Sequence, residues 1–303
     1  MTVKYRKYFY IFSAVLVTVS IVALAVFRLP LGIDFKGGSL LEVQFQATEE
    51  GNVDVPEISE IQGAFNELEL GSVQVQVSED NTMLLRFADV KEQRHQEILN
   101  KIDEITESEF EELRFDSVGP VIGIETAERS VEAIIIVSIM IVVYVAWAFR
   151  KIHQPIGSVR YGFIAIVALL HDIIITTGVF AIYAYLAGAE VGVPFIAALL
   201  TILGYSVNDT IIIFDRVREN LNRFGSRIEF SEIVAKSVRE NITRSVFTSL
   251  TTLLVLFSIL VFGGATIQDF ILTLIIGIFI GTYSSIALAS PLLVSWAERL
   301  SSR

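Results

Sequence analysis

The stretch PFIAALLTILGYSVNDTIIIFDR, residues 194–216, reads as a membrane-spanning helix with a carboxylate among apolar side chains. Crossing the apolar core of a membrane takes roughly 20 residues, and this stretch is long enough. Asp209 lies seven residues before Arg216, which is about 10 Å along a helix. A carboxylate at that depth costs free energy, so such residues usually have a function. We therefore predict that Asp209, with its neighbour Asn208, belongs to the functional site.

Five further stretches share this length and apolar character. The chain has 303 residues, of which 53% are hydrophobic, a share too high for an ordinary soluble domain. We predict a polytopic α-helical membrane protein with six transmembrane helices, at residues 8–28, 131–149, 159–186, 193–214, 245–262 and 270–296. The last five of these lie in residues 127–303. The chain contains no cysteine, which excludes disulfides and thiolate metal ligands.

An acidic segment interrupts the membrane helices. Residues 31–126 contain 22 acidic and six basic side chains, whereas the rest of the chain contains 12 acidic and 17 basic ones. A well-solvated surface explains most of the acidic excess. The sequence has no basic stripe suited to nucleic acid, so we expect no nucleic-acid partner.

The basic residues predict the orientation of the chain in the membrane. They precede the first span, flank the loop after the second, and fill the segment 215–244, whereas the loops AGAEVG and GGATIQD contain none. Cytoplasmic loops carry the excess of Lys and Arg, and anionic lipid headgroups also attract them. We therefore expect both termini and the segment 215–244 in the cytoplasm, and residues 31–126 on the extracytoplasmic side.

The acidic segment has the pattern of a small α+β domain. Residues 39–46, 72–78, 82–88 and 111–118 are rich in β-formers, and 72–78 alternates strictly. Residues 56–70 and 91–106 have apolar side chains at helical spacing. The order of these elements is βαββαβ, which predicts a ferredoxin-like domain between the first and second membrane helices.

Two glycine-containing joints connect this domain to the membrane helices. One contains Asp34, Gly37 and Gly38, and the other contains Gly119, Pro120 and Gly123. Glycine permits conformations closed to other residues, and proline fixes one backbone dihedral. The joints could be ordinary linkers or a hinge that lets the domain move, and composition alone favours linkers.

Other polar residues lie inside the predicted spans. His171 and Asp172 fall near the middle of the third, and Arg244 and Thr248 near the start of the fifth. A buried carboxylate is stable either protonated or paired with a cation, and Arg244 is the nearest candidate because its guanidinium binds carboxylates well. We predict that Asp209 alternates between these two states and so carries protons.

Structural explanations compete for the remaining polar residues. Thr248 could serve helix packing, which small polar residues favour in membranes. His171 could bond to a neighbouring helix without titrating, and Asp172 could be its structural partner or that of a polar group in the fourth span. We find no metal-ligand spacing, phosphate loop or nucleophile–base pattern, and therefore predict no enzyme activity, no metal and no cofactor.

Several motifs resemble the SecD/SecF family of protein-export membrane proteins. They are LGIDFKGGSLLE at 31–42 and VGPVIG at 118–123, followed by LLHDIIIT at 169–176, LGYSVNDTIIIFDRVREN at 203–220 and RSVFTSLTTLL at 244–254. The last three look like the SecF branch. The motifs occur in order and cover nearly the whole chain.

This resemblance implies a function in protein export. A chain of this family pairs with SecD in an arrangement like that of resistance-nodulation-division transporters. The pair associates with the SecYEG channel, often with YajC and YidC, and uses the proton motive force to help a translocating polypeptide cross the cytoplasmic membrane. The positions of Asp209 and Arg244 match the family's proton pathway, with protons as the coupling ion. A small-molecule efflux transporter and a non-transporting membrane scaffold are the alternatives.

Overall fold

A computed structural model describes residues 4–47, 53–68, 70, 73–77, 81–106, 108–150 and 156–301 of the chain. The chain divides into two compact units. One unit comprises Met1–Pro30 and Glu132–Arg303, and the other comprises Leu31–Val131. We call the first the membrane unit and the second the outer unit, after the extracytoplasmic side that the sequence predicts for it.

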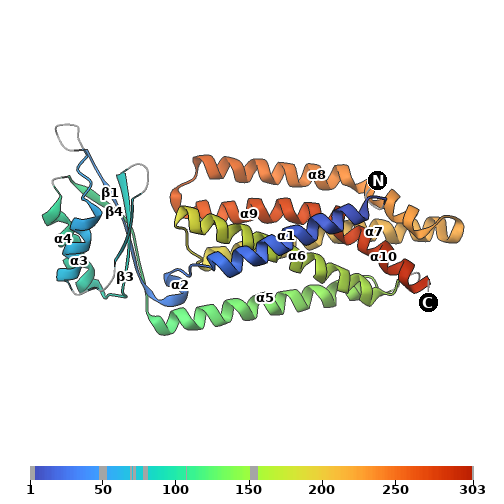
Figure 1. Cartoon of the computed structure of the whole chain (residues 1–303), viewed down its shortest axis with the longest axis horizontal. Helices are drawn as coiled ribbons and strands as arrows, with labels where there is room; N and C mark the ends of the chain where they lie inside the picture. Colours follow the sequence, from blue (N-terminus) through green and yellow to red (C-terminus); the bar gives the residue numbers. More distant parts are fainter. Residues whose placement is uncertain are drawn as a thin grey trace. The chain divides into compact units, whose positions relative to one another are not determined.

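The described part of the chain contains six helices long and apolar enough to cross a membrane, which confirms the predicted number. Figure 1 labels these helices. Their bounds are α1 (Arg6–Phe27), α5 (Pro120–Ala148), α6 (Ser158–Ala187), α7 (Val193–Phe224), α8 (Phe230–Phe262) and a last span that joins α9 (Ala265–Ser284) through a π-helix, η3 (Ser285–Ala289), to α10 (Ser290–Ser301).

Burial separates an inner from an outer set of these spans. More than half of the side chains are buried in the apolar windows of α6 and the last span, and half in that of α7. In the windows of α1, α5 and α8 only a small share of the side chains is buried. Because the solvent of such faces is lipid, their apolar side chains need no protein cover. The inner helices α6, α7 and α9 pack on one another, and α6 and α7 carry the buried acids Asp172 and Asp209.

Three predicted helix ends differ clearly from the observed ones. The helix predicted at 131–149 begins at Pro120, where proline suits a first helical turn. Its first turns are mostly exposed, and in the polar stretch that follows Nε of Arg129 lies 3.8 Å from Oε1 of Glu125 one turn earlier. The helices predicted to end at 214 and to begin at 245 both continue into the segment 215–244, which consists of the ends of α7 and α8 joined by a short turn, η2 (Gly225–Arg227).

The outer unit contains a four-stranded antiparallel sheet. Its elements are α2 (Ile33–Lys36), β1 (Gly38–Phe45), α3 (Ile58–Glu67), β2 (Gln74–Val77), β3 (Thr82–Phe87), α4 (Glu92–Ile105) and β4 (Phe110–Val118). After α2, the order βαββαβ is the predicted one, and the strands lie in the order β2-β3-β1-β4. The ends of the predicted strand 72–78 lie outside the described residues.

One face of this sheet carries the core of the outer unit. Helices α3 and α4 cover that face in Figure 1. Ile61 and Phe65 of α3 and Ile98 and Ile102 of α4 are fully buried against Leu41 and other alternate residues of β1 and β3. This alternation follows from the period of two along a strand. Helix α3 begins with a capping box formed by Glu57 and Glu60.

The two glycine joints form one packed contact within the outer unit. Gly37 has φ of 79° and ψ of 164°, a conformation that is essentially restricted to glycine. A Cβ atom at Gly37 would lie 2.6 Å from Cα of Pro120, and one at Gly123 would lie 2.7 Å from the backbone nitrogen of Gly37. These glycines therefore serve close packing, and the joints are not the pair of independent linkers that composition favours.

Gly37→Ala is expected to destabilise the chain by about 2–4 kcal/mol, because it adds both backbone strain and a steric overlap. Gly119→Ala is the matched control, since a Cβ atom there meets no atom within 4 Å. The midpoint of thermal unfolding of the purified chain in detergent measures both. Equal midpoints for the two variants would contradict the packed joint.

Candidate functional site

Asp209 lies on α7 in a shell of hydroxyl groups. Its side chain is buried, and the residue is 7% exposed. The hydroxyl of Ser245 on α8 donates to Oδ1 at 2.5 Å, and the hydroxyl of Ser285 on η3 donates to Oδ2 at 2.6 Å. Among the described residues no cation pairs with this carboxylate. Two hydroxyls stabilise a carboxylate far less than a cation does, so this arrangement suits an acid that can bind a proton.

Arg244 does not lie against Asp209, so the structure has the state without the ion pair, which is one of the two predicted states. Its side chain is exposed on α8, and it forms no ion pair with any residue that the structure describes. The reason is the helical period, which sets consecutive residues about 100° apart. Because Ser245 points toward Asp209, Arg244 points away from it. The structure therefore contains the unpaired state of Asp209.

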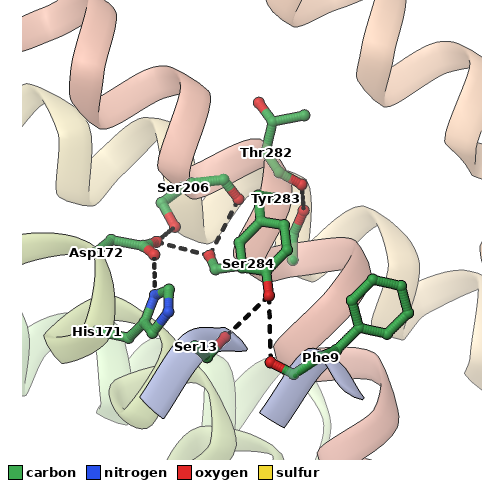
Figure 2. Close-up of polar contacts among 10 residues, drawn as sticks. Phe9, Ser13, His171, Asp172, Ser206, Thr282, Tyr283 and Ser284 are labelled. Carbon is green, nitrogen blue, oxygen red and sulfur yellow. Dashed lines mark hydrogen bonds and ion pairs between the residues drawn. The ribbon is translucent and has the colours of Figure 1, made fainter. Parts of the chain in front are cut away.

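Asp172 on α6 forms a second buried acidic centre, and it is fully buried. Figure 2 shows its three polar contacts. Nδ1 of His171 lies 2.9 Å from Oδ1, and the hydroxyls of Ser206 on α7 and Ser284 on α9 donate to Oδ2 at 2.5 Å and 2.8 Å. Asp172 is thus bonded both to its predicted partner His171 and to a polar group of the fourth span.

The ring of His171 faces the neighbouring span. It stacks on Tyr283 of α9, with ring centroids 6.2 Å apart. The hydroxyl of Tyr283 bonds to Ser13 of α1 at 3.1 Å and donates to the carbonyl of Phe9 (Figure 2). Nε2 of His171 is buried and has no hydrogen-bond partner among the described residues. His171 and Asp172 therefore lie where α1, α6 and α9 meet.

A second layer of hydroxyls lies one helical turn from Asp209. Tyr205 precedes Asp209 by four residues and donates to Ser249 of α8 at 3.2 Å. Ser249 bonds in turn to Thr282 of α9 at 2.6 Å. The same three membrane spans therefore provide both layers. The second layer lies nearer to Val193, the first residue of α7, than the first layer does.

Two predicted site residues point away from this cluster. The side chains of Asn208 and Thr248 are exposed, on α7 and α8 respectively. Each precedes by one residue a buried residue of the cluster, Asp209 or Ser249, so the helical period again explains the difference. The structure does not bring Asn208 or Thr248 to the carboxylates.

The last span contributes serines that sequence reasoning missed. Ser284 and Ser285 are both fully buried, and each bonds to one of the two carboxylates. The available signal was the pair of serines followed by Ser290 in an otherwise apolar stretch. The hydroxyl of Ser290 donates to the carbonyl of Ser285 at 2.8 Å, where the helix widens into a π-helix. Such turns are frequent at functional sites.

Close packing fixes this part of α9 against α7. A Cβ atom at Gly277 would lie 2.2 Å from Cδ1 of Ile202, and one at Gly281 would lie 3.0 Å from Cβ of Ser206. The small residues allow the backbones to approach, as is common between membrane helices. Within the described ranges no group of three or more His, Cys, Asp or Glu residues could hold a metal ion.

The sequence matches two family descriptions. "Protein export membrane protein SecD/SecF, C-terminal" matches residues 98–299, and "SecD/SecF GG Motif" matches residues 22–49. The second match covers the glycines of the first joint, and the first covers both buried carboxylates.

Curated relatives match over nearly the full chain. The protein translocase subunit SecF of Anaerolinea thermophila is 36% identical over 292 residues, which cover 96% of this chain and 92% of the relative. The protein of the same name from Thermobaculum terrenum is 40% identical over 311 residues, covering 98% and 94%.

A solved structure has the same fold. The crystal structure of SecDF from Thermus thermophilus, a translocon-associated membrane protein, matches with a TM-score of 0.81 and 30% identity. The match covers 98% of this chain and 38% of the SecDF chain. This chain therefore spans well under half of the length of that protein.

Proposed function

This chain belongs to the SecD/SecF family of protein export membrane proteins, and we propose that it acts as a SecF-like accessory subunit of the preprotein translocase, driven by the proton motive force. It is a multi-pass protein of the cell membrane. Its ends and the segment 215–244 face the cytoplasm in this proposal, and the outer unit faces the opposite side.

A SecD subunit completes the transporter in this proposal. The solved SecDF chain is longer, and this chain covers only 38% of it. The exposed sides of α7 and α8 that carry Asn208, Arg244 and Thr248 are available for such a subunit. The SecYEG channel, YajC, YidC and the translocating polypeptide are the further partners proposed, and the apolar sides of α1, α5 and α8 contact membrane lipid.

One observation carries the proton-driven mechanism. Asp209 is a carboxylate buried among membrane helices, with two hydroxyl donors and, within the described residues, no cation. When the carboxylate binds a proton it becomes neutral, so the protonated form places no charge in the apolar core. The ionised form needs a cation, which Arg244 can supply after a rotation or displacement of α8.

The hydroxyl layer of Tyr205, Ser249 and Thr282 provides a proton path to this acid. Hydroxyl groups both donate and accept hydrogen bonds, so they can pass a proton along a chain. In the proposed orientation the layer lies on the extracytoplasmic side of Asp209. Protons would then reach Asp209 from outside and leave toward the cytoplasm. Such coupling requires two conformations that bind the proton with different affinity.

Inverted membrane vesicles test this function. Vesicles with and without the chain, each supplied with SecD and the channel, translocate a preprotein in the presence of ATP and a proton gradient. We expect the gradient to accelerate completion of translocation only when the chain is present, and a protonophore to remove that acceleration. Equal acceleration without the chain would contradict the proposal.

A further inference from the structure

The two buried carboxylates, Asp209 and Asp172, are linked through the same two elements, α7 and the serine pair Ser284–Ser285 of the last span. Asp209 belongs to α7 and receives a hydrogen bond from Ser285 of η3. Asp172 belongs to α6 and receives hydrogen bonds from Ser206 of α7 and Ser284 of α9. Ser206 and Asp209 are three residues apart, which is about 4.5 Å along the helix. Ser284 and Ser285 are consecutive.

A movement of the serine pair relative to α7 would therefore change the hydrogen bonds of both Asp209 and Asp172. If the serine pair moves relative to α7, the bond of Ser285 to Asp209 is strained, and so is the bridge that Asp172 forms between Ser206 and Ser284. The widened turn at Ser285–Ala289 is a place where such a helix can change its local geometry. Hydrogen bonds to a carboxylate stabilise its ionised form, so both proton affinities depend on this turn.

From this geometry we infer that Asp172 and His171 form a second proton-binding site, coupled to Asp209 through Ser284 and Ser285. The inference rests on the proposed proton-binding role of Asp209. A protonated His171 would balance the negative charge of ionised Asp172. The buried Nε2 of His171 has no partner among the described residues. Two ionisable sites so connected titrate as a pair, so the proton on one site depends on the charge of the other.

Other ionisable groups on the surrounding helices have different partners or point away. On α1 and α10, Arg6 bonds to Glu298 at 2.7 Å, and Tyr10 bonds to Ser295. Around Asp209, Arg244 is exposed. The remaining groups are bonded elsewhere, namely Glu240 to Asn220, Asp215 to Arg218, Tyr205 to Ser249, and Tyr183 to Asp269. Among the residues that the structure describes, His171 is thus the ionisable group that contacts Asp172.

Infrared difference spectroscopy of the full chain with SecD in lipid tests the coupling. The C=O band of the protonated Asp209 carboxyl is identified by its loss in Asp209→Asn and followed as the pH changes. Asp172→Asn removes one negative charge near Asp209. We therefore expect the Asp209 band to appear at a lower pH than in the wild type, by on the order of one pH unit.

Ser284→Ala keeps the acid and removes only one of its donors. It should move the band in the same direction by a smaller amount, because ionised Asp172 is then less stable. Ser138→Ala is the matched control, since within the described ranges the hydroxyl of Ser138 on α5 bonds only to the carbonyl of Ile134 in its own helix. That variant should leave the band unchanged.

The outcomes separate this inference from the function on which it rests. An Asp209 band that titrates at the wild-type pH in both Asp172→Asn and Ser284→Ala overturns the coupling and leaves the proposed function standing. An equal shift in Ser138→Ala also overturns it, because the effect would not be specific. An Asp209 carboxyl that never titrates overturns both.

Discussion

Asp209→Asn is expected to abolish the acceleration of translocation by a proton gradient while the ATP-driven part continues. Asparagine has the size of aspartate, and its side-chain oxygen can still accept from Ser245 or Ser285, so we expect the helices to stay packed. It cannot bind a proton, so the change between a protonated and an ionised site is lost. The rate of completion in inverted vesicles, with and without the gradient, measures this effect.

Asp215→Asn is the matched control for this variant. Asp215 lies on the same helix, but it is exposed and pairs with Arg218 at 2.5 Å. An exposed pair of this kind contributes little to stability, typically about 0–1 kcal/mol. The acceleration should therefore remain in this control. If Asp209→Asn keeps the wild-type acceleration while the chain is present in normal amount, Asp209 is not the coupling acid.

Arg244→Ala is expected to have an equally large effect on proton-driven translocation and almost none on stability. The side chain is exposed and makes no ion pair within the described residues, so its removal breaks no contact of this state. In the proposed second state Arg244 pairs with ionised Asp209, and without it that state would hold an unpaired charge in the apolar core. Such a charge costs several kcal/mol, which corresponds to a loss of the accelerated rate of two or more orders of magnitude.

Two further variants make this test specific. Arg244→Lys keeps the charge but loses the planar fork that binds a carboxylate through two bonds, so it should retain part of the acceleration. Arg239→Ala removes another exposed arginine from the same helix and should retain all of it. A lowered unfolding midpoint in Arg244→Ala, or full acceleration in that variant, would contradict the role of Arg244.

The sequence predicted the architecture well because it depends on strong patterns. Long apolar runs identify membrane helices, and the alternation in β1 and β3, together with the helical spacing in α3 and α4, identifies the outer domain. The ends of the helices were less predictable. A hydropathy pattern predicts a helix only as far as the edge of the apolar region, whereas α5, α7 and α8 continue as helices into polar sequence.

Only the ionisable residues of the candidate site could be predicted from the sequence. Asp209, Asp172 and His171 stand out in apolar runs because burying an ionisable group in a membrane costs free energy, so such residues usually have a function. Ser284 and Ser285 do not stand out, because a single hydroxyl adds little free-energy cost to a membrane helix and serines are common there. Their contacts depend on which spans pack together, and α9 is far from α6 and α7 in sequence.

The direction of a side chain is what the sequence predicts least well. Arg244 and Ser245 are neighbours in sequence, yet Ser245 bonds to Asp209 and Arg244 is exposed. A pairing inferred from charge and proximity in sequence ignores the rotation between consecutive residues. The joints at Gly37 and Gly123 show a related limit. A glycine in a sequence indicates either a flexible backbone or close packing, and the sequence does not distinguish the two.

The most direct test of the central claim is the protonation state of Asp209 itself. Infrared difference spectra of the chain with its SecD partner in lipid, recorded across a pH titration, reveal a protonated buried carboxyl by its C=O band. We predict a band that titrates, that disappears in Asp209→Asn, and that persists in Asp215→Asn. A spectrum in which the loss of Asp209 removes no titrating band would contradict the account.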